Sequence, residues 1–440
     1  MKKVTILDPF VKTFAKWYLR KCSKCDTTYI EAVLNSFKEK NSCPECKKQI
    51  IFGKILLKTI MFCMKINNDD LSNLSSDEEL IYSIKALFRG ISKRGFMGIE
   101  TGMPLYVVFD ITNKCNLKCI HCYSAEQKGE LTTKEAYHIL DMLYKSGAAM
   151  VDFGGGEPLL RKDIFDIISY SKKLGFYTSI STNGTLLNKT CVTRLRSLDI
   201  DHICISLDGA KPETHDFIRQ KKGTFLKTID GIKNSINAGM NTQISTVFMK
   251  NNVDELCELY HLLESLKVNG WYIYDFIPAG HGKEIKNNVL DIEQREKLFK
   301  QLQELAIFSK MSLKPYPDLV TINSSLDKKS YFYKAYSQLT EFIKGCPTGR
   351  WTCHISSNGD LHPCHLLPFK LGNLKQENFE DVWFKNNNQV LKELRDKTLL
   401  KGNCGICKYR DVCGGCRARA FWETGNYLES DNCWINTARC

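Results

Sequence analysis

The sequence reads Leu105-Tyr-Val-Val-Phe-Asp110 and, shortly after it, Cys115-Asn-Leu-Lys-Cys119-Ile-His-Cys122-Tyr123. The first run is apolar and β-rich, so it predicts a strand, and the cysteines then stand in the loop that follows this strand. Three thiolates within eight residues can hold three irons of a [4Fe–4S] cube. Because no fourth cysteine is close in the sequence, the fourth iron keeps an open position for a ligand from outside the protein.

Six β-rich runs alternate with helical segments between residues 104 and 280, and the run at 105–110 is the first of them. The other five lie at 150–153, 176–180, 202–207, 243–248 and 271–277. Repeated strand–helix units predict a parallel sheet. We therefore expect an α/β fold, an open (β/α)6 partial TIM barrel, with functional residues on the loops at the carboxyl ends of its strands.

The C-x3-C-x2-C spacing, with the aromatic Tyr123 after the last cysteine, resembles the signature of the radical S-adenosylmethionine (SAM) superfamily. The resemblance covers residues 104–440 and implies that Cys115, Cys119 and Cys122 bind the catalytic cluster. It also implies that SAM chelates the open iron through its amino and carboxylate groups. One electron then cleaves SAM to methionine and a 5′-deoxyadenosyl radical, which abstracts a hydrogen atom from the substrate.

Two other strand ends resemble the SAM pocket of this superfamily. The second strand runs into Gly154-Gly155-Gly156-Glu157-Pro158, similar to the GGEP loop that binds the SAM amino group. Glycines let the backbone approach a ligand closely, and a carboxylate suits a cationic amine. The fourth strand ends in Ser206-Leu-Asp208, similar to a ribose-contacting segment, and Arg219 is a candidate for the SAM carboxylate or for a surface ion pair. The expected cofactor contacts are Gly155, Gly156, Glu157, Pro158, Asn183, Ser206, Asp208 and Tyr123.

Nine more cysteines lie in the Cys-, Gly- and turn-rich segment 346–440, and all of them except Cys440 belong to one pattern of eight. The run Cys413-Gly-Gly-Cys416-Arg-Ala-Arg-Ala420 resembles a SPASM domain, and eight thiolates suit two four-ligand [4Fe–4S] clusters. The resemblance implies two auxiliary clusters, one held by Cys346, Cys353, Cys364 and Cys416 and the other by Cys404, Cys407, Cys413 and Cys433. Such clusters would take up the electron released when a substrate radical becomes an oxidised product. A zinc-held domain is the alternative.

His365 is the candidate catalytic residue. In the sulfatase maturases of this superfamily, an acidic residue that serves as a base follows the third of these cysteines, whereas here His365 follows Cys364. This departure argues against sulfatase maturation. A histidine can also accept a proton near neutral pH, and the alternative is a role beside the cluster or at the surface.

The N-terminal segment carries two C-x2-C pairs, Cys22 with Cys25 and Cys43 with Cys46. Two such pairs at this separation are typical of a tetrahedral site for one metal ion. The ion is zinc or a mononuclear iron in a rubredoxin-like site, and the sequence leaves both open.

The start of the chain and its most apolar stretch indicate a cytoplasmic protein. The chain starts without an apolar signal segment, and its most apolar stretch, 50–66, is interrupted by lysines and too short for a transmembrane helix. An apolar stripe that includes Ile51 and Phe52 is expected to pack on the protein itself, with a membrane surface as the alternative. The net charge of +13 suits an anionic substrate or an acidic flavodoxin- or ferredoxin-type electron donor. No basic run is dense enough to indicate nucleic acid.

These observations divide the chain into five regions: a metal knuckle at 1–50, a helical linker at 51–103, the barrel at 104–285, a helical connector at 286–345 and the auxiliary-cluster domain at 346–440. The leading hypothesis is a radical SAM oxidoreductase that modifies a peptide or protein side chain. The first alternative is an enzyme of haem or cofactor biosynthesis that acts on a small anionic molecule. The second is a non-enzymatic electron carrier.

Overall fold

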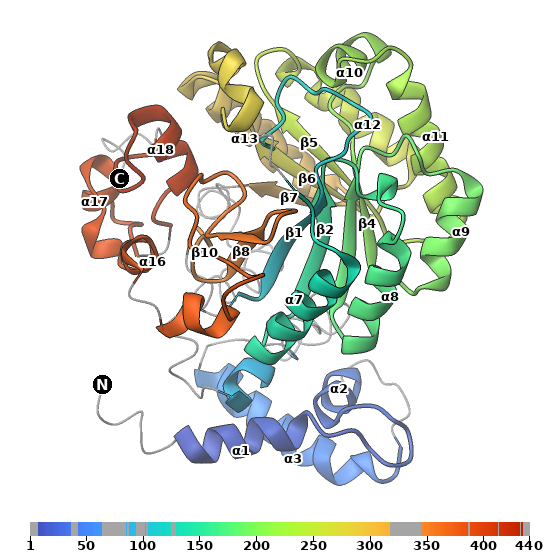
Figure 1. The fold of residues 1–440 in the computed structure, drawn as a ribbon, viewed down its shortest axis with the longest axis vertical. Coiled ribbons are helices and arrows are strands. Elements are labelled where there is room, and N and C mark those ends of the chain that lie inside the picture. Colours follow the sequence, from blue (N-terminus) through green and yellow to red (C-terminus); the bar gives the residue numbers. More distant parts are fainter. Residues whose placement is uncertain are drawn as a thin grey trace.

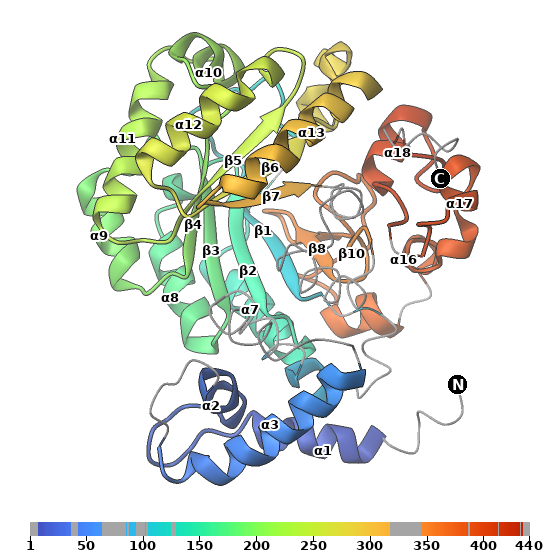
Figure 2. The same ribbon diagram turned by 180° about the vertical axis from the view of Figure 1, so that it is seen from behind.

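The computed structural model describes residues 8–36, 43–63, 85, 88–93, 102, 104–124, 129–316, 345–385, 388–411, 413–431 and 433. Their centre is one ten-stranded sheet in the order β10-β9-β8-β1-β2-β3-β4-β5-β6-β7, with helices covering its outer face (Figures 1 and 2). The six predicted strands form its parallel middle, which confirms the predicted open barrel. They are β1 (Tyr106–Thr112), β2 (Met150–Gly155), β3 (Tyr177–Thr182), β4 (His202–Ser206), β5 (Thr242–Phe248) and β6 (Gly270–Asp275).

Alternation of side chains along the strands separates an apolar outer face from a polar inner face. Val107 and Phe109 of β1 lie in the main hydrophobic core beneath the helices, whereas Asp110 faces the other side with polar neighbours. The covering helix α7 begins at the Thr132–Glu135 capping box, which satisfies backbone donors at its start. The helices of the barrel are α7 (Thr133–Ser146), α8 (Ile164–Leu174), α9 (Lys189–Ser197), α10 (Pro212–Arg219), α11 (Thr224–Asn237) and α12 (Leu256–Leu266), with the short turns η2 (Pro158–Leu160) and η3 (Val253–Glu255).

The connector after β6 is only partly helical. It contains η4 (Gly280–Asn288) and α13 (Ile292–Phe308), as expected, but residues Ser312–Tyr316 form strand β7, which pairs in parallel with β6. The expectation of a purely helical segment was therefore wrong at this point. Residues 317–344 of the connector lie outside the described residues.

The C-terminal region continues the barrel sheet. Strand β8 (Thr352–Ile355) pairs in parallel with β1, and β9 (Asp360–His362) and β10 (Gly372–Asn373) follow in antiparallel order. A buried ion pair also joins the C-terminal region to the barrel, because Asp275 at the end of β6 binds Arg419 of the helix α18 (Arg417–Thr424). The remaining elements are η5 (Asp381–Lys385), α16 (Gln389–Arg395), η6 (Lys397–Leu399), α17 (Gly402–Ile406) and α18 (Arg417–Thr424).

The N-terminal helices α1 (Asp8–Tyr18), α2 (Tyr29–Asn35) and α3 (Cys46–Cys63) lie below the barrel (Figures 1 and 2). In the helical stretch 88–93, Arg89 donates to the carbonyls of Ala148 and Gly175, which precede β2 and β3. These contacts place the stretch at the amino-terminal edge of the sheet. Within the described residues, no helix is long and apolar enough to cross a membrane.

Two members of the predicted apolar stripe on α3, Ile51 and Phe52, do not pack as expected, and the side chains of its other members, at 55, 56 and 61, lie outside the described residues. Ile50 is buried, but the neighbouring Ile51 and Phe52 are 62% and 58% exposed. Gly53 faces α1 and α2 instead, since a Cβ there would lie 2.5 Å from Val33. The prediction that Ile51 and Phe52 pack on the protein was therefore wrong.

Candidate active site

The cysteine loop, residues 113–124, follows β1 and lies across the carboxyl edge of the sheet. The amide of Glu157, after β2, donates to the carbonyl of Lys114 at 2.7 Å. The amide of Ile120 donates to the carbonyl of Ile218 in α10, and the amide of Gly282, after β6, to that of Cys122. Backbone bonds to three separate segments therefore hold the loop in place.

The charges of the three thiols in the loop act on one another, and hydrogen-bond donors lie close to two of their sulfurs. The amide of Leu117 points at the Cys115 sulfur at 3.4 Å, and a guanidinium nitrogen of Arg219 lies 3.6 Å from the Cys119 sulfur. Burial raises the pKa of Cys122 to about 11, and the charges of Cys119 and Cys115 add to this shift. Adjacent soft ligands with N–H and cationic partners fit an iron–sulfur cluster. When bound with SAM, such a cluster supplies the electron for SAM cleavage.

Glycine is required at positions 155 and 156 because the backbone there lies very close to the end of β1 and to the cysteine loop. Gly155 has a φ of +121°, and a Cβ on it would lie 2.3 Å from the Thr112 carbonyl oxygen. A Cβ on Gly156 would lie 2.3 Å from the carbonyl oxygen of Lys114. Any side chain at either position would therefore displace the loop. Pro158 is buried and begins η2.

The Glu157 carboxylate is fully buried and links the ends of β2 and β3. It accepts hydrogen bonds from the Thr182 hydroxyl at 2.7 Å and the Asn183 amide at 2.8 Å. Burial raises its pKa, and these hydrogen bonds oppose that shift. Contact between Glu157 and the SAM amine stays a prediction.

Asn183 and Ser206 lie at the same edge of the sheet. The Asn183 side chain donates to Asn116 of the cysteine loop at 2.8 Å. Ser206 ends β4 and accepts a weak bond, 3.4 Å, from the Ser245 hydroxyl. Both positions are compatible with the predicted SAM contacts, which stay predictions.

Asp208 and Arg219 form a buried ion pair next to the cluster cysteines. Their charged groups are 2.6 Å apart, and Nε2 of His121 lies 3.5 Å from the same carboxylate oxygen. Burial raises the pKa of Asp208, but the charge of Arg219, the neighbouring His121 and His215 and a hydrogen bond from the Val247 amide together outweigh this effect and leave the pKa below its usual value. Because Arg219 is only 7% exposed, the surface ion pair considered from the sequence was wrong. The pair holds the guanidinium against Cys119.

The inner face beneath the cysteine loop carries a cluster that the sequence did not reveal. The Tyr123 hydroxyl donates to Asp110 at 3.0 Å, and Nε2 of His354 lies 2.8 Å from the other carboxylate oxygen. The His365 ring packs edge-on against Tyr123, with centroids 4.9 Å apart. The polar residues Asp110 and His354 within apolar strands were the available signal for this cluster.

Tyr123, predicted to contact SAM, thus belongs to this inner-face cluster. Burial lowers the pKa of His365. Its predicted role as a base is untested and stays a prediction.

Other strands of the barrel extend the polar inner face. Asp152 of β2 accepts hydrogen bonds from Ser179 and Ser181 of β3 at 2.6 and 2.7 Å. Lys314 of β7 donates to Gln243 and to the Tyr272 hydroxyl. The inner face therefore carries acids, hydroxyls and a lysine.

Several hydrogen-bond donors point at sulfurs of the second predicted auxiliary set. The amides of Tyr409 and Gly415 point at the sulfurs of Cys407 and Cys413 at 3.4 and 3.3 Å. Arg417 and the Asp431 amide approach the Cys404 sulfur. Donors of this kind fit thiolate ligands of a cluster. The predicted cysteines are Cys404, Cys407, Cys413 and Cys433.

In the first predicted auxiliary set, the structure separates Cys353 from the other three cysteines. Cys346 and Cys364 both contact the Thr348 hydroxyl. Burial and the nearby charge of Cys346 raise the pKa of Cys416. Cys353 instead pairs in register with Val107 and lies in the main hydrophobic core, 1% exposed. Burial alone raises the pKa of its thiol. The described arrangement thus brings together Cys346, Cys364 and Cys416 but not Cys353.

This separation predicts different effects of two cysteine substitutions on iron content. Cys353→Ala is expected to keep the full iron content after reconstitution, since its side chain faces apolar residues. Cys364→Ala, the matched control, is expected to lose up to about four irons per chain. Iron analysis of both variants tests this. Equal iron loss in the two variants would show that Cys353 is a ligand after all.

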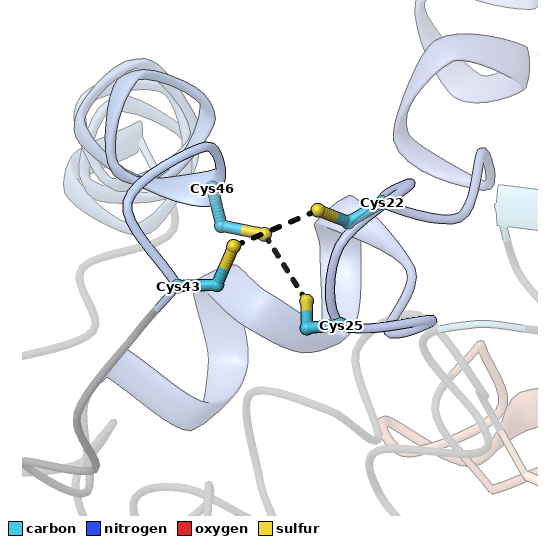
Figure 3. A group of neighbouring side chains, drawn as sticks. All are labelled: Cys22, Cys25, Cys43 and Cys46. Carbon is cyan, nitrogen blue, oxygen red and sulfur yellow. Dashed lines mark hydrogen bonds between the residues drawn. The ribbon is translucent and has the colours of Figure 1, made fainter.

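The N-terminal cysteines come together as predicted (Figure 3). The sulfurs of Cys22, Cys25, Cys43 and Cys46 all lie within 4.8 Å of one another. Cys22 and Cys43 are 3.8 Å apart, and Cys25 and Cys46 are 3.7 Å apart. Hydrogen bonds from Thr27 lower the pKa of Cys25 to about 7, which favours the thiolate that binds metals.

Two domain families match this chain. The radical SAM superfamily matches residues 109–263, and the SPASM iron–sulfur cluster-binding domain matches residues 346–417. The AdoMet-dependent heme synthase of Methanosarcina barkeri is 36% identical, over 75% of this chain and 96% of its own length. The mycofactocin maturase MftC of Mycobacterium tuberculosis is 30% identical, over 72% of this chain and 80% of its own.

Solved structures agree on the fold. Streptococcus suis SuiB bound to S-adenosylmethionine superimposes with a TM-score of 0.64, at 18% identity, over 92% of this chain and 93% of its own. Because the relatives are synthases and maturases, the electron-carrier alternative is not retained. The cysteine loop, its strand-end partners and these matches agree that the chain is an enzyme of the radical SAM superfamily with a C-terminal SPASM domain.

Proposed function

We propose that this enzyme oxidises a small anionic substrate of the tetrapyrrole class. The observation that carries the proposal is the match to the heme synthase of Methanosarcina barkeri, which spans nearly the whole of that protein at 36% identity. A second relative from the same organism is named Fe-coproporphyrin III synthase and is 29% identical over 86% of its length. This proposal replaces the peptide as the preferred substrate.

The polar side chains on the inner face of the sheet are consistent with the binding of a polar substrate there. Asp110, Tyr123 and His354 meet there beneath the cysteine loop, and Lys314 adds a cation on the opposite part of the sheet. The net charge of +13 favours the approach of an anion. His354 and His365 belong to the SPASM domain, so that domain contributes directly to this face.

The predicted auxiliary clusters suit an oxidation. Cys364 adjoins His365, which contacts Tyr123 of the cysteine loop. A cluster there would lie close to the substrate and could accept the electron left on it. We further propose a cytoplasmic setting and an acidic flavodoxin- or ferredoxin-type donor, for which the basic charge of the chain is suited.

The test uses enzyme with reconstituted clusters, SAM, dithionite and iron coproporphyrin III as the probe. We expect 5′-deoxyadenosine to form together with an oxidised tetrapyrrole of changed mass, and both to disappear when SAM is omitted. Liquid chromatography with mass spectrometry follows both products. Formation of 5′-deoxyadenosine with an unchanged tetrapyrrole would overturn the substrate class but not the radical SAM activity.

Modification of a peptide side chain is the second candidate. It is favoured by the similarity to mycofactocin maturase and by the N-terminal unit α1–α3, which precedes both matched domains. A short open reading frame next to this gene would favour a peptide, whereas neighbouring tetrapyrrole genes would favour the first candidate. Incubation with the encoded peptide then gives the direct test by mass shift.

A further inference from the structure

The four N-terminal sulfurs have the spacing of ligands to a single metal ion. A tetrahedron with metal–sulfur bonds of about 2.3 Å has edges of about 3.8 Å. The distances of 3.8 Å between Cys22 and Cys43 and 3.7 Å between Cys25 and Cys46 match this edge (Figure 3). A [4Fe–4S] cube would need wider spacing, because each thiolate binds a different iron.

The local backbone is built to present these thiols. Cys22 and Cys25 lie in a tight turn closed by a hydrogen bond from the Cys22 amide to the Thr27 carbonyl at 2.9 Å, with Asp26 at a φ of +54°. Cys43 and Cys46 lie in the turn that starts α3, where the Cys46 amide donates to the Cys43 carbonyl. Two facing turns of this kind complete a closed four-ligand site.

We propose that Cys22, Cys25, Cys43 and Cys46 bind one zinc ion that folds the N-terminal unit, independently of the radical chemistry. Four thiolates close the coordination sphere, as in structural zinc sites, and leave no position for a substrate. The proposal does not depend on which substrate the barrel accepts.

The position of the site in the fold, far from the cysteine loop, favours zinc over a redox-active iron. The contacts of Arg89 put the stretch 88–93 at the amino-terminal edge of the sheet, and Phe88 of this stretch packs against Phe14 and Tyr18 of the N-terminal unit. The unit therefore lies at this edge, whereas the cysteine loop lies at the carboxyl edge. Strands of six residues, such as β2, span about 20 Å at about 3.3 Å per residue. Electron transfer slows steeply with distance, so an ion at this place is poorly located to relay electrons to the cluster.

Among the side chains of the unit that the structure describes, the buried apolar cluster is small. It consists of Tyr18, Ile30, Ala32, Val33 and Ile50, together with the ligands Cys22 and Cys46 themselves. Small units of this kind are commonly held by a metal. An ion pair between Lys85 and Glu31 then ties α2 to the part of the chain that precedes the barrel.

The experiment measures zinc and iron together in the full-length protein with reconstituted clusters. We expect about one zinc per chain in addition to the cluster iron. Cys25→Ser is expected to lose the zinc with unchanged iron, and Cys257→Ser, an exposed cysteine on α12, is expected to keep both metals. Cys25 is exposed, so this substitution removes no buried side chain, and any unfolding of the unit follows from the loss of the zinc.

Two further readouts separate the outcomes. Growth with cobalt should give the visible absorption of tetrahedral Co(II)–thiolate in the wild type and not in Cys25→Ser. Limited proteolysis should cut residues 8–63 faster in Cys25→Ser while the barrel fragment persists. A wild type without zinc would overturn the proposal, as would an iron content that falls by about one per chain in Cys25→Ser, the sign of a rubredoxin-like iron.

Discussion

Cys122→Ala is expected to abolish the formation of 5′-deoxyadenosine from SAM in the reconstituted enzyme. The expected loss is at least about 10³-fold, which corresponds to about 4 kcal/mol of lost transition-state stabilisation. The physical reason is that the loop holds its cluster through only three thiolates. Cys122 is the third of these, and its carbonyl also anchors the loop to the Gly282 amide.

The matched control for this substitution is Cys257→Ala. Cys257 is exposed on α12 and outside every cysteine motif, so its replacement should leave SAM cleavage unchanged. Chromatography of 5′-deoxyadenosine and iron analysis are run on both variants. Substantial SAM cleavage by Cys122→Ala would mean that another side chain ligates the cluster.

Asp275→Ala is expected to destabilise the joint between the barrel and the SPASM domain. The Asp275 carboxylate lies 2.6 Å from Nε of Arg295 and 2.8 Å from a guanidinium nitrogen of Arg419. All three side chains are at most 2% exposed. Removing the carboxylate leaves two guanidinium groups buried without this partner, which typically costs about 3–5 kcal/mol.

The readout for Asp275→Ala is the midpoint of thermal unfolding, because a multidomain cluster protein does not unfold in two states. We expect the midpoint to fall by at least about 5 °C. Glu258→Ala is the control, since its ion pair with Lys211 is half exposed and typically contributes no more than about 1 kcal/mol. Equal midpoints for Asp275→Ala and the control would contradict the proposed role of this network.

The barrel strands could be predicted from the sequence because each combines β-branched or aromatic residues with a helical segment after it. All six expected runs overlap β1 to β6. The cysteine motifs were equally visible, since ligand spacing is a local property of the chain. The glycines at 155 and 156 also followed from local sequence, and the structure supplies their reason in the close approach to Thr112 and Lys114.

Long-range pairings could not be predicted in this way. Asp110 and His354 are 244 residues apart in the sequence, and only the parallel pairing of β8 with β1 brings them together. The same pairing turns Cys353 toward the core, although the resemblance to a SPASM domain implied that it is a ligand. Arg219 and Asp208 likewise reveal their burial only when α10 folds back onto the cysteine loop.

The central claim is that the cluster held by Cys115, Cys119 and Cys122 keeps one iron open for SAM. Electron–nuclear double resonance on the reduced enzyme, with SAM labelled by 15N at its amino group and 17O at its carboxylate, measures this directly. We predict hyperfine coupling to both labels, and its absence in Cys122→Ala. A cluster signal that shows no coupling to either label, and that SAM does not change, would contradict the claim.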